Sequence, residues 1–157
     1  MLKMTYISAG VVSAACLLGS AAGAETFTMA GTGRVTDQVM VPGGGAAPLG
    51  ALVATSTTKV TMASGKALAG KGHCASWTTD PGSLFTVQGA CAGTDDSGTY
   101  SVVYSCQTDA KANADDCWGR LTGVGGAYAG KTGTMSWRLM RNADGQTSAF
   151  TGAGVWN

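Results

Sequence analysis

The sequence has 157 residues, with ten lysines and arginines, nine aspartates and glutamates and one histidine, which gives a formal net charge of +1 at pH 7. A nearly neutral chain lacks the basic surface that nucleic acid or an anionic membrane attracts, so nucleic acid is excluded as an expected partner. Charged residues form only 12% of the chain, which leaves Thr, Ser, Gly and Ala to cover much of the surface, as in many exported β-proteins.

The N-terminus has the pattern of a secretory signal peptide. Lys3 supplies a positive start, residues 7–18 are apolar or small, and Ala22-Gly23-Ala24 is a small-residue cleavage site. The apolar run is too short to span a bilayer. A buried N-terminal helix and a lipoprotein anchored at Cys16 are the alternatives, but the apolar run continues past this cysteine.

Cleavage after residue 24 would leave 157 − 24 = 133 residues, enough for one domain with a modest core. We therefore expect a signal peptide over 1–24 and a single domain over 25–157. We also expect a periplasmic or extracellular location and no integral membrane span after cleavage.

From Thr26 onwards the apolar residues alternate with polar ones, which is the pattern of half-buried strands. Tyr100, Val102, Tyr104 and Cys106 share one face of their run. In the same way Met135, Trp137 and Leu139 share a face that is opposed by Thr134, Ser136 and Arg138. We expect strands over about 25–36, 49–63, 66–79, 83–92, 98–108, 117–123, 132–141 and 147–156.

Turn sequences separate these runs. Asp80-Pro81-Gly82, Asp95-Asp96-Ser97-Gly98 and Asn142-Ala143-Asp144-Gly145 contain the Asx and Gly residues that tight turns favour. A short helical turn over 109–115 is an option, although Asn113 lies inside it. Eight short antiparallel strands favour an all-β closed barrel, because closure removes exposed edges; a β-sandwich is the alternative. A barrel of this size is filled by side chains or holds one small ligand.

Four cysteines remain after the predicted cleavage, and an even number is typical of disulfides in an oxidising compartment. Three pairings are possible. We favour Cys74–Cys91 and Cys106–Cys117, because each bond would join the two strands of one hairpin. The spacing lacks Cys-x-x-Cys and the chain has one histidine, so we expect no metal site and no cofactor.

Residues 121–134 contain Gly-x-Gly-Gly-x-Tyr-x-Gly-x-x-Gly around Tyr128. This hairpin resembles the Gly-rich hairpin of the allene-oxide-cyclase-like barrels, which include plant dirigent proteins. The resemblance implies an eight-stranded barrel with an apolar interior that binds a small hydrophobic molecule. Some members direct a cyclisation or coupling without a cofactor, often as oligomers, so it also implies that a homo-oligomer is one expected state.

No catalytic motif of that group aligns outside the hairpin, so the site residues must be chosen by chemistry. The catalytic candidates are Arg138, Arg120, Tyr100, Tyr104 and His73. The expected ligand-binding residues are Tyr100, Tyr104, Trp137 and Arg138. Each choice has a structural alternative: a surface histidine, core aromatic layers, or an arginine that faces solvent. Asp95-Asp96 and Asp115-Asp116 are better explained as a hairpin turn and a solvated loop than as calcium ligands.

Three functions remain open. The first is an exported barrel that binds an apolar or aromatic small molecule in its interior. The second is a cofactor-free cyclase, isomerase or lyase on the same barrel, which needs at least two polar groups that converge in one pocket. The third is a protein-binding module that acts through loops such as residues 41–49.

Overall fold

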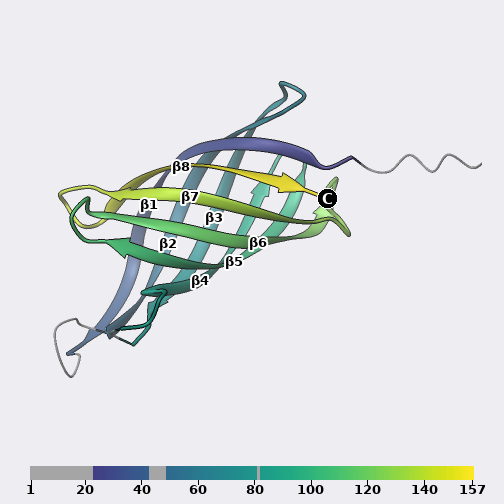
Figure 1. The fold of residues 1–157 in the computed structure, drawn as a ribbon. Coiled ribbons are helices and arrows are strands. Elements are labelled where there is room, and N and C mark those ends of the chain that lie inside the picture. Colours follow the sequence, from purple (N-terminus) through teal and green to yellow (C-terminus); the bar gives the residue numbers. More distant parts are fainter. Residues whose placement is uncertain (1–22, 43–48, 81) are drawn as a thin grey trace, which may run out of the picture.

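The computed structural model describes residues 23–42, 49–80 and 82–157. The predicted signal peptide therefore lies almost wholly outside the described residues, as does most of the loop proposed for protein binding. The described part is an antiparallel barrel in which each strand pairs with its neighbours in the sequence and β8 closes onto β1 (Figure 1). The prediction of a closed eight-stranded barrel is confirmed.

Each predicted range overlaps one strand of the structure, but the strand predicted over 25–36 continues to Val41 and the one predicted over 83–92 spans Val87–Asp95. Eight strands are present in the described residues. They are β1 (Glu25–Val41), β2 (Leu49–Met62), β3 (Ala67–Thr78), β4 (Val87–Asp95), β5 (Gly98–Asp109), β6 (Ala114–Gly126), β7 (Thr132–Arg141) and β8 (Thr147–Trp156).

Two local predictions are wrong. Residues 110–113 form a turn and not a helical segment, and Asn113 adopts a positive φ of 51° there. Asp115 is not in a solvated loop: β6 begins at Ala114, and Asp115 is buried with 7% exposure. The carboxylate can enter the sheet because Thr108 donates a hydrogen bond to it and Arg141 pairs with it.

The predicted disulfides are present. Cys74 is bonded to Cys91, and Cys106 is bonded to Cys117. In each case the two cysteines are directly opposite one another in the register of a hairpin, β3 with β4 and β5 with β6. Two such bonds are consistent with an oxidising compartment.

The two ends of the barrel differ. At the closed end, the turn between β6 and β7 carries Tyr128, whose ring stacks on Trp156 at 4.8 Å between centroids and meets the edge of Tyr100. Its hydroxyl donates a hydrogen bond of 2.8 Å to Asp95. Gly126 and Gly130 have positive φ values of 65° and 77°, which allow the chain to reverse around this side chain.

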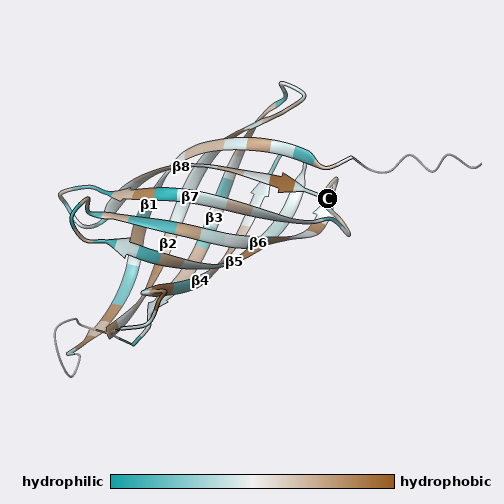
Figure 2. Cartoon of the chain, viewed as in Figure 1, coloured by the Kyte–Doolittle hydropathy of each residue, from teal (hydrophilic) through white to brown (hydrophobic). Residues whose placement is uncertain are grey.

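The opposite end, which we call the mouth, contains the β1–β2, β3–β4, β5–β6 and β7–β8 connections. β1 and β2 extend beyond the barrel wall there, since β8 pairs with β1 only as far as Arg34 (Figure 1). The far end of β1 is hydrophobic: Val39, Met40 and Val41 are at least half exposed (Figure 2).

Candidate functional site

A cavity of about 270 Å³ lies inside the barrel, between the closed end and the mouth. The buried cluster beneath it includes Phe27, Met62, Leu68, Leu121, Tyr128 and Trp156. At the mouth the cavity reaches Gly145 and Gln146, which are exposed. The interior is therefore hollow towards the mouth and filled by side chains at the closed end.

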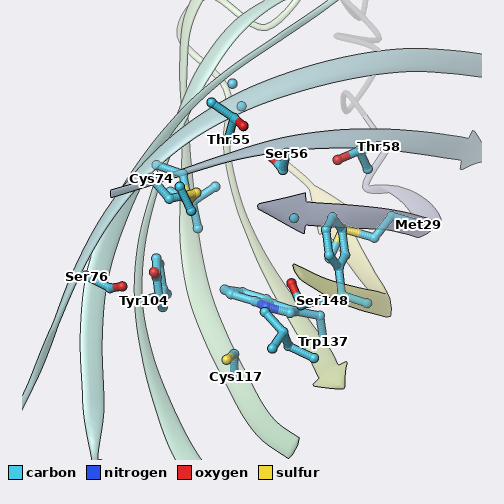
Figure 3. A pocket seen from close by; sticks show the side chains of 18 of the residues that line it. Met29, Thr55, Ser56, Thr58, Cys74, Ser76, Tyr104, Cys117, Trp137 and Ser148 are labelled. Carbon is cyan, nitrogen blue, oxygen red and sulfur yellow. A yellow bond between two sulfur atoms is a disulfide. The ribbon is translucent and has the colours of Figure 1, made fainter. Parts of the chain in front are cut away.

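The cavity has two unlike walls. On one side Tyr104, Trp137 and Phe150 project from β5, β7 and β8. Across the barrel, β2 and β3 present small side chains: Ala54, Ser56, Thr58, Gly72 and Ser76. In the close view Trp137 lies across the pocket, with Tyr104 on one side of it and Ser148 and Met29 on the other (Figure 3). The empty space results from this contrast of large against small residues.

Rings are regularly paired with glycines on the inner face of the barrel. Every aromatic residue on the inner face of a described strand is directly opposite a glycine in the neighbouring strand. The six pairs are Phe27 with Gly154, Phe150 with Gly31, Tyr104 with Gly89, Tyr100 with Gly93, Trp137 with Gly152 and Trp156 with Gly133. At Gly31, Gly89, Gly93 and Gly154 an added Cβ would come within 3.0 Å of the facing ring. Each of these four rings therefore lies over its glycine and occupies the place of the missing side chain.

The tyrosines of the interior are neutral phenols. Burial raises the pKa of Tyr100 and of Tyr104 above the ordinary value of 10, and the charges of Asp95 and Asp115 respectively contribute in the same direction. Burial and the hydrogen bond to Asp95 raise the pKa of Tyr128 as well. Near neutral pH these side chains can donate hydrogen bonds, but they do not supply a base.

A polar row crosses the inner wall at the mouth. Thr108, Asp115 and Arg141 come from β5, β6 and β7, and the latter two line the cavity. The hydroxyl of Thr108 donates to Asp115 Oδ1 at 2.7 Å, and Arg141 Nη2 pairs with Asp115 Oδ2. These are the charged side chains of β6 and β7 that reach the cavity.

The structure brings some of the expected site residues together and separates others. Tyr100, Tyr104 and Trp137 line the cavity. His73 and Arg120 are exposed on the outer face. Arg138 also faces outward, and it pairs with Asp116 Oδ2 at 2.6 Å and with Asp109 Oδ2 at 3.1 Å. These two carboxylates raise the pKa of its guanidinium, so Arg138 serves as an outer cross-strand tie and does not contact the cavity.

Asp115 and Arg141 were missed as site residues, although alternation contained the signal. Arg141 is two residues beyond Leu139 and four beyond Trp137, so it shares their face. The Cys106–Cys117 bond likewise places Cys117 on the face of Tyr104, and Asp115 follows by the same parity. Asp115 was instead interpreted as part of a solvated loop, and Arg141 was not considered as a site residue.

Over residues 23–42, 49–80 and 82–157, no group of three or more His, Cys, Asp or Glu side chains is placed to hold a metal ion. The same residues include no helix that is long and apolar enough to cross a membrane. No protein-family model matches the chain, and no curated protein matches it either.

Proposed function

We propose that this protein binds a compact apolar or aromatic molecule inside the barrel. The observation that carries the proposal is the cavity of about 270 Å³, whose wall is mostly apolar. The outer face is mixed: on β2, Thr57, Lys59 and Thr61 are exposed, but Val53 is exposed as well. An apolar solute gains from leaving water for the apolar wall of an enclosed cavity.

The volume sets the size of the ligand. An apolar cavity of about 150 Å³ takes one benzene ring. A cavity of about 270 Å³ is nearly twice as large, so it suits two fused rings or a short branched chain. Trp137 and Tyr104 meet edge to face at 5.3 Å and together offer a ring face and a ring edge to a flat ligand.

Binding can be tested with naphthalene as the probe, by titrating the protein and following its amide and indole NMR signals. A leucine at Ala54 would fill the cavity, whereas a leucine at the adjacent Val53 would lie on the outer face, where Val53 is 43% exposed. We expect Ala54→Leu to weaken binding at least tenfold and Val53→Leu to leave it unchanged. Absence of binding to the unmodified protein, or equal binding by both variants, would refute the proposal.

Mass spectrometry of protein purified under native conditions provides an independent test. We expect a small apolar compound to accompany the unmodified protein and to be depleted in Ala54→Leu. Its identity would define the ligand class directly.

A cofactor-free cyclase, isomerase or lyase is the second candidate, and one observation favours it. Tyr104, Asp115 and Arg141 come from three strands and line one cavity, which meets the requirement for converging polar groups. The test is to incubate any copurified compound with the protein and to look for an isomeric or cleaved product. An unchanged compound would leave binding alone.

We also propose that the protein is exported. Support comes from the two disulfides and from the leader pattern in residues 1–24. N-terminal sequencing of the exported protein should begin at Glu25. A mature chain that retained residues 1–24 would contradict this.

A further inference from the structure

The polar row of Thr108, Asp115 and Arg141 at the mouth limits which ligands the cavity can bind. The inference drawn from it rests on the binding function proposed above. We infer that the ligand is an uncharged molecule of two-ring size that carries one hydrogen-bond acceptor, in the simplest case a carbonyl oxygen, and that Arg141 binds this acceptor at the mouth of the cavity.

The backbone fixes the position of Arg141. Its amide N–H donates to the carbonyl oxygen of Asn113 at 3.0 Å, and its own carbonyl accepts from the Asn113 side chain at 3.0 Å. Across the sheet, Asp115 is opposite Leu139, two residues before Arg141. Asp115 and Arg141 are therefore diagonal neighbours on the inner face, which is within the reach of long side chains.

At the Asp115–Arg141 pair, the hydrogen bonds leave mainly N–H donors for a ligand. Both carboxylate oxygens of Asp115 are engaged, one by Thr108 and the other by Arg141. A guanidinium has five N–H donors, and among the described residues the Arg141 side chain donates only to Asp115. The Arg141 side chain is also 35% exposed, against 10% for Asp115. A ligand that enters the mouth thus meets N–H groups.

The charges around the mouth favour an uncharged acceptor. Asp115 already balances Arg141, so a carboxylate ligand would be placed beside a carboxylate side chain. Arg34 also lines the cavity; it is exposed and lies near Asp144, whose pKa it helps to lower. On the outer face of β5, β6 and β7, Asp109 and Asp116 outnumber Arg138. A carbonyl oxygen accepts from the free N–H groups without adding a negative charge to this region.

The experiment uses the full-chain protein and three probes of matched size: 2-acetylnaphthalene, 2-ethylnaphthalene and 2-naphthoate. Calorimetric titration measures each dissociation constant in the unmodified protein and in three variants. The Asp115→Asn/Arg141→Met double variant removes both charges together, so no buried charge is left unpaired. The Asp116→Asn/Arg138→Met variant makes the same change on the outer face and is the matched control.

We expect the inner double variant to weaken 2-acetylnaphthalene about tenfold, the usual contribution of a hydrogen bond to a charged group. Binding of 2-ethylnaphthalene should stay within about twofold, and the outer control should change neither. Asp115→Asn alone leaves Arg141 uncompensated, so it should strengthen 2-naphthoate about tenfold.

An unchanged affinity for the ketone in the inner double variant would overturn the inference, as would an affinity for 2-naphthoate that does not respond to Asp115→Asn. Either result with 2-ethylnaphthalene still bound would leave the proposed binding function standing. Failure of all three probes to bind the unmodified protein would refute both.

Discussion

The inner-face rings and their glycine partners determine how much of the barrel stays empty. A ring that lies over a glycine fills the space of one absent side chain and remains against the wall. Trp77 and Trp118, which point outward, are not opposite glycines; they face Ala51 and Gln88, and Ser105 and Ser136. The pairing is thus a property of the interior. A single methyl group added at one of these glycines would displace the facing ring and so change the volume of the cavity.

Gly93 and Gly72 provide a matched test, because they are opposite each other on β4 and β3. A Cβ at Gly93 would clash with the ring of Tyr100. One at Gly72 would come too close to the hydroxyl of Ser56, at 2.7 Å, which can rotate away, and its contact with the carbonyl oxygen of Ala92 at 3.5 Å is an ordinary one. We expect Gly93→Ala to lower the free energy of unfolding by about 1–3 kcal/mol and Gly72→Ala by less than about 1 kcal/mol. Urea unfolding measures both, and equal losses would contradict the role of the ring.

The tyrosines make stability depend on alkaline pH. Residues 25–157 contain three tyrosines, Tyr100, Tyr104 and Tyr128, and folding raises the pKa of each. A raised pKa in the folded state stabilises it fully below the ordinary value of about 10, and this contribution is lost as pH rises above that value. We expect unfolding between about pH 10 and 11 to release up to three protons.

Absorbance of tyrosinate during urea unfolding at several pH values measures this release. Tyr128→Phe should reduce it by one proton, and it should also destabilise the protein below pH 9 by about 1–2 kcal/mol because the bond to Asp95 is lost. Three tyrosines that ionise near pH 10 in the folded protein would contradict the effect of burial on their pKa values.

At the scale of elements, the sequence predicted the existence of each strand, but it did not predict on which side of the sheet the charged side chains lie. Alternation identified every strand, because a half-buried strand must alternate. It placed the start of β6 three residues late, since Asp115 and Asp116 look like loop residues until their partners on β5 and β7 are known. For the same reason the sequence did not show which face Arg138 lies on, and Arg141 was not recognised as a site residue. Alternation along a strand shows which residues share a face. Only the register between strands shows which charged residue has a partner.

Each of the two disulfides joins the two strands of one hairpin. The loops that they close have similar lengths, with sequence separations of 17 and 11. The chain-entropy model gives about 3 kcal/mol for each, and a difference of only about 0.4 kcal/mol between them. We expect the Cys74→Ala/Cys91→Ala and Cys106→Ala/Cys117→Ala variants to lose similar amounts of stability in urea. A loss below about 1 kcal/mol for either would mean that the hairpin pairing alone holds those strands.

In the molecule as a whole, the closed end contributes the packed core, and the mouth contains the proposed ligand contacts. The closed end holds the buried cluster around Tyr128 and Trp156, and β1 begins and β8 ends there (Figure 1). The mouth holds the Asp115–Arg141 pair and the connections that border the cavity. A change in the covalent connections at the closed end should therefore spare binding as long as the register of the strands is kept.

A circular permutant tests this division. Glu25 is paired with Trp156, so a short Gly-Ser linker can join Asn157 to the start of β1 as one more hairpin turn at the closed end. New termini can open the β2–β3 turn at Ser64 and Gly65, which are exposed at that same end. Such a permutant, made in an oxidising compartment, should form both disulfides and bind naphthalene within about threefold of the unmodified chain, because every strand pair is retained.

A control permutant opened at Val103, in the middle of β5, should not fold, since it divides a strand that pairs on both sides. If the first permutant formed the disulfides but lost binding, the closed end would contribute to the ligand site as well as to stability.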